Sequence, residues 1–142
     1  MAIDVSYVEK SMRLRSLLVP LLAELDSTVP NLNVGGCGAV AIAICTVCKD
    51  FHPEVIYLHS DELCKVSDSA EHVVTRIGNF YYDSTGKFTR SQLLKEWPSC
   101  NLTKVPFSYL VRAVNRSTLW NHRFCRYHLS TVAKIANKYQ RN

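Results

Sequence analysis

A cysteine flanked by glycines lies early in the chain, and a histidine and an aspartate follow it at positions 72 and 83. Cys37 stands in Gly35-Gly36-Cys37-Gly38, directly before a run of small apolar residues, so it is predicted to begin a helix. The positive end of a helix dipole and a nearby imidazolium both favour a thiolate. We therefore expect Cys37, His72 and Asp83 to act as nucleophile, base and orienting carboxylate.

The spacing of the histidine and the aspartate supports this expectation. Gly78-Asn79 separates two β-rich runs and predicts a two-residue hairpin loop. Counting from this loop places His72 opposite Thr85 and makes His72 and Asp83 diagonal neighbours on one face, with Cβ atoms about 7 Å apart. Asp83 is expected to accept the Nδ1 proton of His72 and to leave Nε2 for the thiol. The register does not establish that this face meets the start of the Cys37 helix.

The rest of the sequence predicts an α+β fold in a single domain, residues 1–142. An N-terminal helix and loop (1–30) precede a candidate catalytic core (31–86) and a helical, basic C-terminal part (87–142). The helix that begins at Cys37 is apolar nearly all round and is expected to be buried. Helices are predicted over 4–25 (bent near Pro20), 37–49, 89–97, 108–116 and 121–138, and strands over 54–58, 71–77, 80–83 and 104–107.

Residues 31–86 resemble the papain-like superfamily of cysteine peptidases and amidases, which includes bacteriocin-processing peptidases and transglutaminase-like enzymes. The resemblance rests on the glycine-flanked Cys37, on His72-Val73-Val74-Thr75-Arg76-Ile77 and on Tyr81-Tyr82-Asp83-Ser84-Thr85-Gly86. It implies a papain-like core, in which a buried helix carrying the nucleophile packs on a small antiparallel sheet. It also implies a peptidase, isopeptidase or amidase that works through an acyl-thioester and needs no metal or organic cofactor.

The same resemblance suggests an oxyanion hole. Peptidases of the group carry a glutamine six positions before the cysteine, and this chain has Asn31 there, with Asn33 as an equal candidate. The backbone N–H of Cys37 would be the other donor. Water would resolve the acyl-enzyme in a hydrolase, and an amine would do so in a transferase.

Three further residues are expected to contact a protein or peptide substrate. Gly36 would let a substrate backbone approach the sulfur, and Trp97 would line a substrate groove. Tyr57, Tyr81 and Tyr82 are further candidates for lining this groove, with packing in the core as the alternative. Arg76 shares the predicted face of His72 and would bind a substrate carboxylate, with a surface ion pair as the alternative.

Composition and charge indicate the expected cellular location and suggest a competing function. The chain shows no signal peptide or span long enough for a bilayer, so its six cysteines are expected to be thiols in a cytoplasm, without membrane association. No acidic residue follows Glu96, whereas eight basic residues do. This asymmetry fits a solvated helix face, or a non-catalytic protein that binds nucleic acid or an acidic protein through its C-terminal helices.

A zinc module is the other alternative. Five possible ligands fall within twenty residues, and two of the cysteines have the two-residue gap of zinc sites: Cys45, Cys48, His52, His59 and Cys64. The paired cysteines fall inside an apolar helix, and the gaps to the histidines match no standard finger. The sequence favours core cysteines and surface histidines here.

Overall fold

The computed structural model describes residues 5–29, 36–59, 71–116 and 128–140. Within these ranges the chain is α+β, as the sequence predicts, with five α-helices and a five-stranded antiparallel sheet. The helices are α1 (Val5–Thr28), α2 (Cys37–Val47), α3 (Arg90–Glu96), α4 (Phe107–Arg116) and α5 (Leu129–Gln140), with a 3-10 turn η2 (Lys49–Phe51). The strands are β1 (Glu54–His59), β2 (His72–Ile77), β3 (Phe80–Asp83), β4 (Gly86–Phe88) and β5 (Asn101–Val105).

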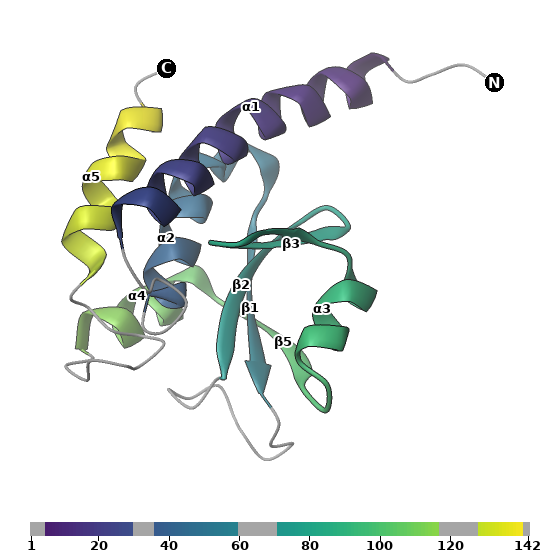
Figure 1. Ribbon diagram of the computed structural model, residues 1–142, viewed down its shortest axis with the longest axis vertical. Coiled ribbons are helices and arrows are strands. Elements are labelled where there is room, and N and C mark those ends of the chain that lie inside the picture. The colour runs from purple at the N-terminus through teal and green to yellow at the C-terminus, as the bar shows by residue number, and fades with distance from the viewer. Residues whose placement is uncertain (1–4, 30–35, 60–70, 117–127, 141–142) are drawn as a thin grey trace.

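The sheet lies between four of the helices on one side and a single helix on the other. Its strand order is β4-β3-β2-β1-β5, so β1 and β2 are interior strands and β5 is an edge. Helices α1, α2, α4 and α5 gather on one side of the sheet and α3 covers the other (Figure 1). Val73 of β2 packs with Ala41 of α2 on the first side, and Val74 packs with Leu93 of α3 on the second. Strand alternation thus supplies an apolar surface to both layers.

Helix α2 is the buried centre of the larger layer, as its sequence predicts. Eight of its eleven residues are buried, because small and β-branched side chains on every face allow the sheet, α4 and α5 to approach it. The helix ends two residues earlier than predicted, at Val47. Its last turn is closed by the Cys48 N–H, which donates to the Ile44 carbonyl, and η2 follows.

The hairpin of β2 and β3 confirms the predicted register near its loop. Ile77 pairs with Phe80, and Gly78 has a φ of 62° at the first loop position, where a two-residue loop of the II′ type requires glycine. The pairing of β2 with β3 stops before it reaches His72. Thr85 does not pair with His72, because β3 ends at Asp83 and the chain turns through Ser84-Thr85 into β4.

Other differences from the predicted elements have local causes. Helix α1 continues to Thr28, three residues beyond the prediction, since Leu25 and Val29 are buried against the core. Strand β4 was not predicted, because its three residues give too short a pattern. Strand β5 begins at Asn101 and already ends at Val105, because its pairing with β1 begins at His59.

At the C-terminus α5 begins at Leu129, and the first part of the helix predicted over 121–138 lies outside the described residues. In the part of the chain that the structure describes, no helix is both long and apolar enough to cross a membrane.

Candidate active site

The histidine and the aspartate of the hairpin form a buried hydrogen bond. His72 Nε2 lies 2.9 Å from Asp83 Oδ2, and the two side chains are 3% and 5% exposed. The diagonal contact expected from the hairpin register is therefore present. The ring is turned the other way, however, because Nε2 and not Nδ1 faces the carboxylate. Nδ1 is the ring nitrogen left for a second partner.

That second partner is Cys37, whose side chain lies close enough to His72 to help raise the pKa of the imidazole. Alternation along β2 puts His72 on the α3 side with Val74, whereas Cys37 packs on the α2 side with Val73. The two side chains meet at the end of the sheet, because each is the first residue of its element. The structure thus brings the thiol, the imidazole and the carboxylate together.

The surroundings of His72 favour its charged form. Burial by itself lowers the pKa of His72, but the hydrogen bonds to Asp83 and Cys37 and the charges of both groups outweigh it and raise the pKa to about 9. Burial likewise opposes ionisation of Asp83, yet bonds from His72 and Thr85 hold the pKa of Asp83 below its ordinary value. An imidazolium beside a carboxylate is the state that this geometry stabilises.

Thr85 fixes the carboxylate from its other oxygen. Its backbone N–H and its hydroxyl both donate to Asp83 Oδ1, at 2.8 and 2.6 Å. Asp83 is therefore bonded through both oxygens and cannot rotate away from His72 without losing these contacts. This role of Thr85 was not predicted from the sequence, although an aspartate two residues before a threonine in a turn is a known signal for such bonds.

Trp97 covers the histidine ring. The aromatic rings of Trp97 and His72 are stacked, with centroids 4.8 Å apart and planes 13° from parallel. Trp97 reaches this position as the C-cap of α3, a helix that begins with a capping box between Thr89 and Gln92. The indole limits the rotation of the imidazole and shields it, and its contact with substrate stays a prediction.

The start of α2 supplies backbone donors beside the thiol. The N–H groups of its first residues, Cys37 among them, have no acceptor within the helix, and Gly36 provides no side-chain cap. Gly36 has a φ of −114°, which any residue adopts, so its backbone does not require glycine. Asn31 and Asn33, the expected side-chain donors of the oxyanion hole, lie outside the described residues.

The remaining expected residues do not reach the histidine. The Nε of Arg76 donates to the Gly78 carbonyl at 3.0 Å, and its guanidinium lies 6.0 Å from the centroid of the Tyr81 ring. Tyr57, Tyr81 and Tyr82 are buried in the core clusters, the alternative weighed for them from the sequence.

The other described cysteines differ from Cys37 in their surroundings. Burial raises the pKa of Cys45 to about 11, and burial with the charge of Cys45 raises the pKa of Cys48 to about 12. Burial and the Glu71 carboxylate raise the pKa of Cys100 to about 11. These thiols resist ionisation near neutral pH.

The residues weighed as zinc ligands are dispersed. Cys45 and Cys48 are buried in and just after α2, His52 is exposed, and His59 Nε2 lies 2.6 Å from Thr103 Oγ1. Cys64 lies outside the described residues. In the described ranges no three His, Cys, Asp or Glu side chains gather closely enough to hold a metal ion.

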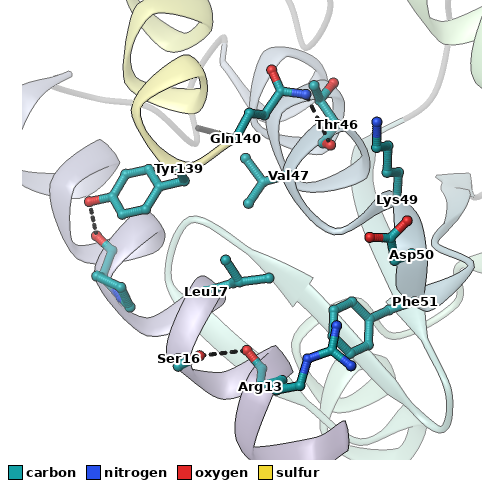
Figure 2. Close-up of a pocket in the computed structure, with 11 residues that line it drawn as sticks. Arg13, Ser16, Leu17, Thr46, Val47, Lys49, Asp50, Phe51, Tyr139 and Gln140 are labelled. Atoms are coloured by element: carbon teal, nitrogen blue, oxygen red, sulfur yellow. Dashed lines mark hydrogen bonds between the residues drawn. The ribbon is translucent and has the colours of Figure 1, made fainter. Parts of the chain in front are cut away.

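A cleft of about 540 Å³ lies away from these residues, between α1, α5 and the end of α2 (Figure 2). Arg13 reaches over the Phe51 ring in it, 5.4 Å from the centroid, and Gln140 donates to the Thr46 carbonyl. Cys37 begins α2 and Thr46 stands near its end, about 14 Å along the axis at 1.5 Å per residue. The cleft is therefore separate from the thiol and the imidazole.

In comparisons with known proteins, no family model, no curated protein and no solved structure matches the chain.

Proposed function

We propose that this protein is a cysteine-dependent hydrolase of the papain-like type, acting on amide, isopeptide or thioester bonds of a protein or peptide. The observation that carries the proposal is the position of His72, which is hydrogen-bonded to Asp83 at 2.9 Å and has the Cys37 side chain as its other polar neighbour. A base that is oriented by a carboxylate and bonded to a thiol is the arrangement that nucleophilic catalysis needs.

The first half of the reaction forms the acyl-enzyme. The thiol proton resides on His72, as the imidazolium that Asp83 stabilises, and the sulfur of Cys37 adds to the carbonyl carbon. The negative oxygen that develops is stabilised by the Cys37 N–H, with Asn31 or Asn33 as the second donor. His72 then gives its proton to the leaving group, the carbon–nitrogen or carbon–sulfur bond breaks, and a thioester remains on Cys37.

The second half releases the acyl group. Water adds to the thioester while His72 takes one of its protons, the bond to sulfur breaks, and the proton returns to Cys37. Asp83 stabilises the imidazolium in both halves, and Thr85 holds Asp83. An attacking amine in place of water would make the same site a transferase.

Access to the sulfur is a separate requirement of this proposal. Cys37 is 1% exposed, so a substrate carbonyl reaches the sulfur only when the packing around it opens. The opening step would precede the chemistry, and it is expected to slow acylation without changing which cysteine reacts.

The competing function, binding of nucleic acid or an acidic protein, has less support from the described residues. Lys104 pairs with Glu54 at 3.0 Å and Lys138 with Glu24 at 2.6 Å, so part of the basic charge of the C-terminal part is balanced. Both pairs are largely exposed and add little to stability. We therefore favour the hydrolase.

An activated ester tests the proposal without knowledge of the natural substrate. With p-nitrophenyl acetate we expect release of p-nitrophenol, and an acetyl group on Cys37 detectable by mass spectrometry of the quenched protein. Cys37→Ala should abolish both, and His72→Ala should lower the acetylation rate by about 100-fold or more, as is typical of a lost general base. Cys100→Ala is the matched control and should behave as the wild type. Acetylation spread evenly over the cysteines would contradict the proposal.

A further inference from the structure

Helix α1 carries an apolar stripe that the core does not use. Three of its large apolar side chains are exposed: Val8 by 41%, Met12 by 66% and Val19 by 58%. Together with the exposed Arg15 they are spaced by four, three and four residues, the spacing of a coiled-coil seam. At 3.6 residues per turn, the four lie within about 60° of one another around the helix. We call these four residues the outer stripe.

The outer stripe is distinct from the face that holds α1 to the core. Leu18, Leu21 and Leu25 are buried, and they lie about 120° around the helix from the outer stripe. From Val8 onward, the first buried residue of α1 is Leu18, and the N-terminal half of α1 lies away from α2 and α5 (Figure 1). Two apolar faces on one helix indicate two packing partners, and the described residues of one chain provide only the first.

The charged residues of α1 indicate which partner fits the outer stripe and in which orientation. In an antiparallel pair of α1 helices with Met12 facing Met12, Arg15 stands three residues to one side of the axis and Glu9 three residues to the other. Glu9 flanks the outer stripe, about 60° around the helix from Met12. Each Arg15 is then level with the Glu9 of the second copy, and the twofold symmetry repeats this opposition of charges. A parallel pair would instead oppose Arg15 to Arg15. Neither Glu9 nor Arg15 forms an ion pair with another described residue.

We propose that the chain forms a homodimer through an antiparallel pairing of α1 helices, with Met12 at the twofold axis and Glu9 opposite Arg15. A membrane surface fits less well, because the stripe is narrow and has a charged residue within it, whereas interfacial helices present a wide apolar face. The dimer is independent of the chemistry proposed for Cys37.

Sedimentation equilibrium of the full chain over a range of concentrations tests the dimer. The expected mass is twice the 16.1 kDa of the chain. Met12→Asp, which places two like charges on the axis, should leave a monomer with an unchanged far-ultraviolet circular dichroism spectrum. Arg15→Glu should raise the dissociation constant about tenfold, because it replaces two attractive contacts with two repulsive ones.

The charge swap separates specific pairing from a general loss of solubility or charge. Glu9→Arg combined with Arg15→Glu should restore the wild-type dissociation constant. Lys10→Glu changes the net charge as much as Arg15→Glu but lies outside the stripe, so it should have little effect. A monomer at every concentration, failure of the charge swap, or a monomer that co-sediments with phosphatidylserine vesicles would each overturn the dimer.

Discussion

His72 occupies an environment in which two opposing effects meet. Burial disfavours the imidazolium, whereas Asp83 and Cys37 favour it, and these two groups together outweigh burial. A buried charge is tolerable only when it is paired in this way. The bond from Thr85 to Asp83 therefore stabilises the imidazolium of His72 as well as the carboxylate that accepts the bond.

At this scale we predict that Thr85→Val destabilises the protein. The change removes the 2.6 Å bond from the hydroxyl to Asp83 Oδ1 and keeps the backbone bond at 2.8 Å. Loss of one bond to a charged group is expected to lower the free energy of unfolding by about 1–2 kcal/mol. Urea denaturation at pH 7 measures it, with Thr85→Ser as the control that keeps the hydroxyl. Equal stability of the valine and serine variants would show that the hydroxyl does not hold Asp83.

The contact and the ring orientation of His72 differ in how far the sequence predicts them. The contact of His72 with Asp83 follows from counting residues away from Gly78-Asn79, because strand pairing is a local rule. The choice of Nε2 over Nδ1 does not follow from it. It depends on the rotation of the ring, which Cys37 and Trp97 help to set from other elements.

The hairpin is the element that joins His72 to Asp83. Its loop needs a positive φ at Gly78, and a Cβ there would meet no atom within 4 Å. A substitution at Gly78 therefore acts through backbone strain and not through a clash.

We predict that Gly78→Ala lowers the free energy of unfolding by about 1–2 kcal/mol, the cost of a positive φ for a residue with a Cβ. Asn79→Ala changes the adjacent loop residue, which has no positive φ, and should cost less than half as much. Thermal unfolding followed by circular dichroism compares the two variants. An alanine at 78 that is no more harmful than one at 79 would rule out this strain.

Elements with strong local signals were predicted well, and those fixed by pairing were not. The buried α2 and the helix α3 are specified by consecutive residues, and α3 begins with a capping box. Strand β4 consists of three residues that extend only because β3 lies beside them, and β5 is positioned by its pairing with β1. The contact between Cys37 and His72 depends on how α2 lies against the sheet, which no single segment specifies.

For the whole molecule, the buried charge pair links stability to pH. The pKa of His72 is raised from 6.5 to about 9, so its contribution is fully present below pH 6.5 and is lost as the pH rises towards 9. The pKa of Asp83 is lowered from 3.8, so its contribution is present above that pH and is lost as the pH falls through the lowered value.

We therefore predict that the pair stabilises the protein most between about pH 4 and pH 6.5. The free energy of unfolding, measured in urea from pH 4 to pH 9.5, should fall above pH 6.5 in the wild type and fall less steeply in Asp83→Asn. Equal slopes in the two proteins would mean that His72 and Asp83 are not coupled in the folded state.

The claim that Cys37 is an activated nucleophile is tested most directly by alkylation with limiting iodoacetamide at pH 6, followed by peptide mass mapping of all six cysteines. The raised pKa values of Cys45, Cys48 and Cys100 keep these thiols protonated at that pH. We predict preferential modification of Cys37 in the wild type and its loss in His72→Ala. Uniform labelling, or labelling of Cys37 that is unchanged in His72→Ala, would show that His72 does not activate Cys37.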